Sequence, residues 1–280
     1  MKNHYNLFLT VCLAFCLFCI TPAATGKVVY VSLNAMGDGS GSSWENACTS
    51  ISAGIAVSAT RQYENRVIDA DEIWVASGRY MEAIKMKEMI SLYGGFSGAE
   101  TSREARDWAV NETIIDATRL NATTVRAANG AALDGFTVTG GHSSGNGGGV
   151  HCPGGSSVSL SNCTISKNYG TQCGGGVFGW DITMTSCLVA ENTDGPGGWF
   201  GVWAAGLSCF GASALLDCTI TGNVELGMGD TGGCVLEGRM ENCTISKNRG
   251  GIGGLRIYGF NRVIENSMIS DNAGSWLGGV

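Results

Sequence analysis

The segment Asn162-Cys163-Thr164-Ile165-Ser166-Lys167-Asn168 decides the fold, because its pattern returns four more times along the chain. The other copies are Ser186–Asn192, Asp217–Asn223, Asn242–Asn248 and Asn266–Asn272. The steps from one copy to the next are 24, 31, 25 and 24 residues. A Gly-Gly motif alternates with them, at Gly148–Val150, Gly175–Val177, Ala205–Leu207, Gly232–Cys234, Gly253–Leu255 and Gly278–Val280. Two interleaved motifs that share one period indicate a stack of structural repeats.

The period and the alternation within each copy predict the fold class. A period near 24 residues is too short for repeats of paired helices, and the segments lack the 3.6-residue apolar rhythm of a helix. Cys163 and Ile165 alternate with polar residues instead, so both point to one side of an extended strand. One coil cannot bury that side alone, but stacked coils can, at the usual strand spacing of about 4.8 Å. The sequence therefore predicts an all-β fold, a single-stranded parallel β-helix solenoid.

Equivalent residues of such a stack form columns along the coil. The predicted buried columns are Leu160, Met184, Leu215, Met240 and Ile264; Cys163, Cys187, Cys218, Cys243 and Ser267; and Ile165, Val189, Ile220, Ile245 and Ile269. Each buried aliphatic side chain contributes roughly 1.5–3 kcal/mol. We expect these three columns to dominate the stability of the fold.

Polar residues are expected at the two ends of each repeated strand. The residue before each position of the Cys column is expected at a tight corner, where Asn and Asp tolerate the left-handed backbone that the corner needs. Stacked Asn side chains at this corner can also hydrogen-bond along the coil axis. A second column closes the other end of the strand and consists of Asn168, Asn192, Asn223, Asn248 and Asn272.

The column of thiols has three interpretations. Neighbouring coils place the Cα atoms within disulfide range, but parallel side chains in register do not readily adopt the S–S torsion of about 90°. A string of metal sites lacks accompanying His residues and a CxxC spacing. Buried free thiols that act as small apolar side chains are the favoured interpretation.

Composition narrows the class of protein. The 280 residues include 44 Gly and 3 Pro, and hydrophobic residues make up 44% against 15% charged residues. The apolar share argues against intrinsic disorder, and no Gly-X-Y period indicates collagen. The formal net charge of −7 argues against a nucleic-acid surface, which needs clustered Lys and Arg.

Residues 1–25 are predicted to form a signal peptide. A short polar start precedes an apolar run from Leu7 to Ile20, which is too short to span a membrane as a helix. An uncleaved N-terminal anchor is the alternative. No later stretch is apolar enough for a membrane-spanning helix, so we expect an exported protein. Removal of residues 1–25 leaves nine of the 12 cysteines, an odd number, so at least one thiol would be free or intermolecular.

The rest of the chain is predicted to form one continuous domain. Residues 26–130 are expected to supply an N-terminal cap and irregular first coils, and residues 131–280 the regular repeats. A helix from Ser43 or Asn46 to Ala59 is expected to cover the open end of the coil, where strand edges would otherwise invite aggregation. The chain stops at Gly278–Val280, inside a repeat motif, and we interpret this as a truncation.

Residues 28–150 resemble the N-terminal part of exported bacterial right-handed parallel β-helix proteins. The matching pieces include Asp71–Ala76, Tyr93–Phe96 and Leu133–Gly141. The repeats look like those of the polymorphic outer membrane proteins, whose Gly-Gly-Ala-Ile and Phe-x-x-Asn motifs correspond to Gly176-Val177 and Ile165–Asn168. This resemblance implies a right-handed, pectin-lyase-like coil, a secreted or outer-membrane location at the cell surface, and an adhesive role.

Catalysis on this fold would need a recognisable site. Glycosidases use two carboxylates about 5–9.5 Å apart, which on stacked coils means acids in one outward column or in adjacent ones. The expected outward column after the Gly-Gly motif holds no acid; it consists of His151, Phe178, Ser208, Val235 and Arg256. Asp181, Asp194 and Asp230 are expected in loops without a partner at the repeat spacing. No catalytic residue, cofactor or metal site is therefore predicted.

A loop is the stronger functional candidate. The 31-residue step contains seven extra residues within Thr193–Trp203, and insertions in solenoids often lie on the binding face. Aromatic side chains there could stack on sugar rings or anchor a protein. The candidate binding residues are Trp199, Phe200 and Trp203, with Tyr169 and Trp276 on loops of the same edge. The alternative is that the two Trp side chains of the insertion pack over neighbouring coils as a satellite core.

These observations predict a non-catalytic secreted or cell-surface protein that binds a surface glycan, or a protein of a host or neighbouring cell. A polysaccharide lyase or glycoside hydrolase of the same fold is the alternative. A structural spacer is a third hypothesis. No nucleic-acid partner is predicted.

Overall fold

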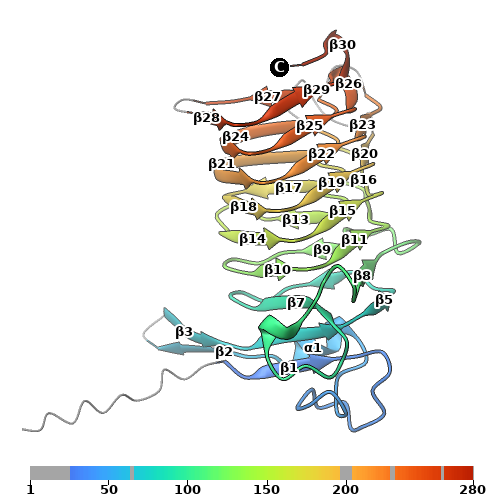
Figure 1. Ribbon diagram of the computed structural model, residues 1–280, viewed down its shortest axis with the longest axis vertical. Coiled ribbons are helices and arrows are strands. Elements are labelled where there is room, and N and C mark those ends of the chain that lie inside the picture. Colours follow the sequence, from blue (N-terminus) through green and yellow to red (C-terminus); the bar gives the residue numbers. More distant parts are fainter. Residues whose placement is uncertain (1–25, 64–65, 196–203, 228–230, 260–261, 280) are drawn as a thin grey trace, which may run out of the picture.

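The computed structural model describes residues 26–63, 66–195, 204–227, 231–259 and 262–279. Short parallel strands stack along one long axis, from α1 and β1 at one end to β30 at the other (Figure 1). The prediction of an all-β parallel β-helix is confirmed.

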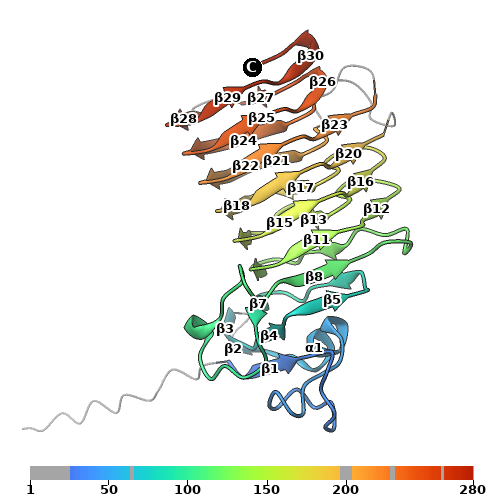
Figure 2. The same cartoon turned by 45° about the vertical axis from the view of Figure 1, so that its right-hand side comes forward.

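Each coil passes through three faces and a short fourth edge (Figure 2). The first face contains β6 (Ile84–Lys85), β9 (Val125–Arg126), β13 (Val150–Cys152), β17 (Val177–Trp180), the first parts of β21 (Leu207–Leu216) and β24 (Cys234–Glu241), and β27 (Leu255–Ile257). The second contains β1 (Val28–Val31), β4 (Glu72–Ala76), β7 (Ser91–Phe96), β10 (Ala132–Asp134), β14 (Val158–Ser161), β18 (Ile182–Thr185), the later parts of β21 and β24, and β28 (Val263–Glu265). Because β21 and β24 cross both faces, these faces join into one sheet.

The third face and the fourth edge are separate sheets. The third face contains β5 (Gly78–Tyr80), β8 (Thr113–Asp116), β11 (Thr137–Thr139), β15 (Thr164–Ser166), β19 (Leu188–Ala190), β22 (Thr219–Thr221), β25 (Thr244–Ser246) and β29 (Met268–Ser270). The fourth edge contains β12 (His142–Ser143), β16 (Tyr169–Gly170), β20 (Thr193–Asp194), β23 (Val224–Glu225), β26 (Arg249–Ile252) and β30 (Ala273–Leu277). All pairings within them are parallel.

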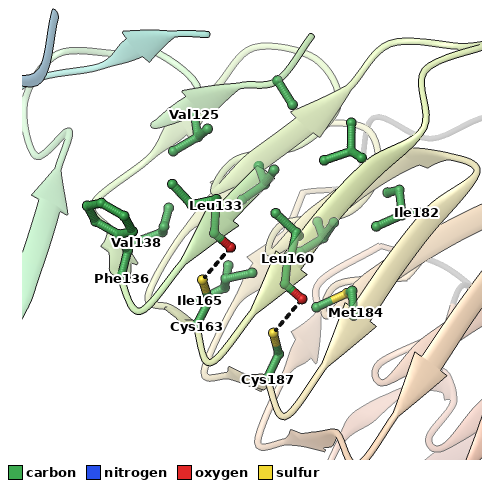
Figure 3. Packing of buried hydrophobic residues seen from close by; sticks show 14 of the residues in the cluster. Val125, Leu133, Phe136, Val138, Leu160, Cys163, Ile165, Ile182, Met184 and Cys187 are labelled. Atoms are coloured by element: carbon green, nitrogen blue, oxygen red, sulfur yellow. Dashed lines mark hydrogen bonds between the residues drawn. The ribbon is translucent and has the colours of Figure 1, made fainter. Parts of the chain in front are cut away.

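The strand register aligns the apolar side chains into columns inside the coil (Figure 3). Leu160, Met184, Leu215 and Met240 are direct partners on successive strands, and each is at most 1% exposed. The column extends further toward the first coils than the repeats suggested, through Leu133, Leu92, Ile73 and Val29, and Phe136 occupies the place of the thiols in the coil of Leu133. Ile264 in the last of these strands is 39% exposed, because no further described strand covers it.

Cys163, Cys187, Cys218 and Cys243 lie in one buried column and are free thiols. Their sulfurs point inward, where Cys163 Sγ donates to Leu133 O and Cys187 Sγ to Leu160 O (Figure 3). The other described cysteines are buried thiols as well: Cys48, Cys152, Cys173, Cys209 and Cys234. Burial raises the pKa of Cys152 to about 12, so its thiol stays protonated at neutral pH.

The predicted left-handed corner is confirmed. Asn162, Ser186, Asp217, Asn242 and Asn266 have φ angles of 51°, 53°, 53°, 53° and 48°. The residue before each Asn of the second column is left-handed as well, including Lys167 at 57° and Glu191 at 55°. Each repeated strand on the third face is thus bounded by two left-handed residues, which keeps it three residues long.

The expected axial hydrogen bonds at the corner are present at two steps, from Asn162 Nδ2 to Asp134 Oδ1 at 2.9 Å and from Asn242 Nδ2 to Asp217 Oδ1 at 3.2 Å, but the continuous amide ladder lies in the second Asn column. Oδ1 of each Asn accepts hydrogen bonds from the backbone N–H and from Nδ2 of the Asn one coil earlier, at 2.9–3.0 Å. Each Nδ2 also donates to a backbone carbonyl, as Asn192 Nδ2 does to Ile165 O at 2.8 Å. The two columns differ in burial: Asn192, Asn223 and Asn248 are 0% exposed, whereas Asn162 at the corner is half-buried.

The second Gly of each Gly-Gly motif packs directly against this ladder. A Cβ atom on Gly149, Gly176, Gly206, Gly233 or Gly254 would lie 2.3–2.6 Å from a carbonyl oxygen of the next coil. It would also lie 2.7–3.0 Å from Nδ2 of the ladder Asn beside it. The Gly-Gly motif and the repeated segment that ends in Asn therefore recur together because the second Gly of one packs against the Asn of the other.

The first coils differ from the prediction in one element. Helix α1 (Ile51–Val57) is shorter than expected, because Cys48 pairs as a bridge with Val31 and Ser50 then caps the helix through Ala53 N. Ile51, Gly54 and Ile55 are buried, and α1 contacts β1 and β4 at the first end of the coil (Figure 1). Its role as a cap stays a prediction. The 3₁₀ helix η1 (Arg103–Ala105) and the antiparallel pair β2 (Thr60–Tyr63) and β3 (Arg66–Ala70) were not expected.

Candidate functional site

The predicted aromatic binding residues are only partly described. Trp199, Phe200 and Trp203 lie outside the described residues, and so does the side chain of Trp276, although its backbone belongs to β30. Tyr169 begins β16 and is half-buried. Its ring stacks on that of His142 in β12, with 4.8 Å between centroids and 15° between planes. The described part of the predicted site is therefore one stacked aromatic pair on the fourth edge.

The column expected to face outward is buried in its middle, which corrects the sequence interpretation. His151, Phe178, Ser208, Val235 and Arg256 are aligned on the first face as expected. Phe178, Ser208 and Val235 are only 2%, 0% and 0% exposed. Phe178 lies within an aromatic cluster, with ring centroids at 5.6 Å from His151, 5.1 Å from Trp180 and 6.1 Å from Phe210.

One pair of acids was missed by the sequence analysis. Asp194 lies in strand β20, and not in a loop, and its register partner on the next coil is Glu225 of β23. The longer 31-residue step between these coils hides the pairing from a search at the usual period. The two residues are 1% and 8% exposed, so neither carboxylate is open to a polymer in solution.

A polar groove lies on the outer side of the third face. It consists of two adjoining hollows of about 270 and 510 Å³, which share Glu112, Thr137 and Thr164. Its polar and aromatic lining is Arg79, Trp108, Glu112, Asp116, Thr137, Thr139, Thr164, Ser166 and Lys167. None of these residues was singled out from the sequence as a binding residue.

Strand alternation places the hydroxyl groups of the groove. Val138 and Ile165 point into the core, so their neighbours on each strand point outward. Thr137 pairs with Thr164, and Thr139 with Ser166, which gives two rows of hydroxyls along the coil axis. The rows continue with Leu188 and Ala190, Thr219 and Thr221, Thr244 and Ser246, and Met268 and Ser270. None of these twelve outward positions from β11 to β29 carries a charge.

Trp108 is a fixed aromatic side chain at one end of the groove. It is 43% exposed, and the Arg106 guanidinium lies 5.0 Å from its ring centroid. Arg106 is held in turn by Asp134 at 2.8 Å and by Gly94 O at 2.9 Å. The backbone of Trp108 packs so closely on Gly95, at φ 91°, that a Cβ there would lie 2.7 Å from the Trp108 Cα. The ring is therefore presented to solvent by a rigid support.

Charged groups lie at the other end of the groove. Asp116 forms an ion pair with Arg79, and its Oδ1 accepts a hydrogen bond from Thr118 N at 2.8 Å. Burial acts to raise the pKa of Asp116, but the bonds from Thr118 and Arg79 outweigh it and hold that pKa below its usual value. Asp116 thus remains ionised at neutral pH.

The two acids of the groove lie on one extended segment of the chain. Glu112 accepts a hydrogen bond from Thr137 Oγ1 at 3.0 Å and lies four residues before Asp116 on extended chain. Four extended residues span about 13 Å. Catalytic pairs need about 5–9.5 Å. The Cα atoms of Glu112 and Asp116 are therefore farther apart than the carboxyl groups of such a pair.

No group of three or more His, Cys, Asp or Glu side chains within 26–63, 66–195, 204–227, 231–259 and 262–279 is arranged to bind a metal ion. The helices of these same ranges are all too short or too polar to cross a membrane.

Comparison with known proteins identifies the type of coil. Residues 110–239 match the family described as right handed beta helix region. The crystal structure of pectate lyase Pel9A is similar at 14% identity, with a TM-score of 0.44, over 91% of this chain and 80% of that one. The pectin methylesterase from Aspergillus niger, in deglycosylated form, is similar at 14% identity, with a TM-score of 0.46, over 89% and 86%. No curated protein matches the sequence. The family match and the parallel strand register together identify the fold as a right-handed parallel β-helix.

Proposed function

We propose that this protein is an exported, non-catalytic binding module that holds a neutral glycan along the polar groove. The observation that carries this proposal is the fixed, exposed ring of Trp108 at the end of two rows of outward hydroxyl groups. The apolar faces of sugar rings can stack on Trp108, and sugar hydroxyls can hydrogen-bond to the outward hydroxyl groups of the groove.

The rigidity of the groove supports this proposal. The hydroxyls lie on strands whose inner side chains are 0% exposed, and Trp108 is held by Arg106 and Gly95. A ligand would therefore order few protein groups on binding, which reduces the entropic cost of association. The hydroxyl rows are uncharged, and the charges elsewhere in the groove are of both signs, Arg79 and Lys167 against Glu112 and Asp116, which favours a neutral polymer.

Export and surface location are part of the same proposal. They are supported by the apolar run Leu7–Ile20 with its polar start and by the small residues before Gly26. N-terminal sequencing of the protein recovered from the culture medium or from the cell surface of an expressing bacterium is expected to start near residue 26. A protein that retains its first residues inside the cell would contradict export.

The binding test uses a glycan array of neutral polysaccharides with the Trp108→Ala variant. We expect binding to weaken at least about tenfold, because truncation of a central aromatic anchor commonly has an effect of this size. Thr164→Val keeps the shape and removes one hydroxyl, so a smaller loss is expected. Trp180→Ala is the matched control, since Trp180 is 38% exposed but lies on the first face.

The same array can contradict the proposal. Equal losses in Trp108→Ala and Trp180→Ala would indicate a general effect on the fold. Binding that survives Trp108→Ala but is lost in Trp199→Ala with Trp203→Ala would assign the ligand to the insertion near residues 193–203 instead.

A further inference from the structure

A separate hollow of about 320 Å³ lies at the border between the first face and the fourth edge. Lys85 and Arg126 line it together with Asn121, Thr123, Ser143 and Ser144. We propose that this cationic hollow binds an oxyanion, the carboxylate or the sulfate ester of an acidic polysaccharide. It shares no residue with the polar groove, so it would be a second and independent binding site.

The first argument is the placement of the two cations. Lys85 of β6 and Arg126 of β9 are direct register partners on neighbouring strands, and both are exposed. Like charges directly opposite each other destabilise a pair of strands. The ion pairs among the described residues include neither of them. The fold therefore accepts an unfavourable pairing that an anion bound between the two side chains would relieve.

The second argument is that a nearby acid is directed elsewhere. Glu82 lies three residues before Lys85, but its carboxylate accepts hydrogen bonds from Ile51 N at 2.7 Å and Ser52 N at 2.9 Å. Glu82 thus serves the first turn of α1 and does not neutralise Lys85. On a chain with a formal net charge of −7, two adjacent cations without an acid are a local exception.

The third argument is the orientation of the guanidinium group. Arg126 Nη1 lies 3.4 Å from Nδ1 of His151, the next residue along this row. Burial and the charge of Arg126 lower the pKa of His151, so its ring is neutral near pH 7 and Nδ1 can accept from Arg126. This contact occupies one nitrogen of the guanidinium and leaves its other N–H groups for a ligand.

The chemistry of the hollow selects the class of ligand. A guanidinium binds carboxylate or sulfate through two parallel hydrogen bonds, and an ammonium adds a point charge beside it. Hydroxyl and amide groups of Ser144 and Asn121 line the same hollow and can bind the hydroxyls of a sugar. A volume near the lower end of the usual range of about 300–1,000 Å³ suits a single sugar unit with its anionic group.

The test measures binding of the full chain to three polymers at low ionic strength by affinity electrophoresis. Polygalacturonate carries only carboxylates, dextran sulfate only sulfate esters, and dextran neither. We expect retention by one or both of the anionic polymers and not by dextran at this site. The double variant Lys85→Gln with Arg126→Gln is expected to lose retention at least about tenfold. The anionic polymer that retains the native chain identifies which oxyanion is bound.

The matched control is Arg239→Gln with Lys247→Gln, which removes the same charge from exposed positions outside the hollow. Its retention is expected to stay within about twofold of the native chain. An equal loss in both double variants would overturn the proposal, because it would show an effect of net charge alone. Retention by neither anionic polymer, or unchanged retention of the first variant, would overturn it as well. Thermal unfolding of both double variants checks that the coil is intact. The Trp108→Ala variant is expected to bind the anionic polymer as the native chain does, because Trp108 lies in the polar groove and not in the cationic hollow.

Discussion

The regular coils and the first coils of this protein are built by different rules. In residues 131–280 each coil contributes the same residue type to the same column, as in the ladder from Asn168 to Asn272. The ladder ends toward the first coils, where Oδ1 of Asn168 accepts from Gly141 N at 2.9 Å and no earlier Asn follows. The residues before 131 form strands in the same sheets without repeating the motifs.

The difference teaches where the candidate sites can arise. Trp108, Arg79 and Asp116 of the polar groove come from the first coils, and so do Lys85 and Arg126 of the cationic hollow. A residue of the inner columns or of the amide ladder must fit the same neighbours in every coil, which favours the same residue type at each step. The first coils have no such constraint, so they can present unlike residues together.

The contact between Gly and the amide ladder should produce the largest effect. Gly206→Ala is expected to destabilise the protein by at least about 3 kcal/mol, because overpacking of a rigid core costs about this much. The new Cβ would lie 2.5 Å from Gly233 O and 2.8 Å from Asn223 Nδ2. Urea unfolding measures the change in free energy.

Gly279→Ala is the matched control for Gly206→Ala, at the same repeat position in the last coil. A Cβ on Gly279 meets nothing within 4 Å, so we expect less than about 0.5 kcal/mol of change. Equal effects of the two substitutions would contradict the contact as the reason for the Gly-Gly motif.

The amide ladder should produce a somewhat smaller effect. Asn223→Ala is expected to destabilise the protein by about 2 to 3 kcal/mol, because it leaves buried donors of Asn192 without their acceptor. Asn272→Ala, at the half-buried end of the ladder, is expected to cost about 1 kcal/mol in the same urea unfolding experiment. A larger effect at Asn272 than at Asn223 would argue against the ladder as a buried cooperative element.

The smallest expected difference between the two regions is in the reactivity of their cysteine thiols. Burial raises the pKa of Cys48 in the first coils and of Cys152 and Cys209 in the regular coils. The thiolate reacts with iodoacetamide, so native labelling at pH 8 is expected to be far slower than in urea and to accelerate as the pH rises.

Mass spectrometry of the alkylated peptides assigns the labelled cysteines in order of time. Cys48 is expected to react before Cys209, because Cys48 Sγ contacts Gly39 O of a surface loop, whose opening is a local event. Labelling of Cys209 at the rate of Cys48 would mean that the regular coils open as easily as the first ones.

Much of the fold was predictable because the same residue pattern occurs in successive coils. The alternation in Cys163-Thr164-Ile165 is weak evidence for a strand, but five copies at one period determine the columns, and the structure has Leu160, Met184 and Leu215 in direct register. The left-handed corner followed from Asn162 and its equivalents for the same reason. The axial hydrogen bonds predicted at the corner are present at two steps. The continuous ladder of the other Asn column was not predicted, because sequence alone does not show which of two polar columns is buried.

The sites were less predictable, because they join residues that no period relates. Arg79, Trp108 and Thr164 line one groove only after the four coils from β5 to β15 have stacked, and the 31-residue step conceals that Asp194 and Glu225 are register partners. Sequence by itself determined the coil, its apolar columns and its corners, since these depend on contacts between equivalent residues. The groove, the cationic hollow and the burial of Phe178 were decided by tertiary structure, since each depends on how unlike residues of different coils pack together.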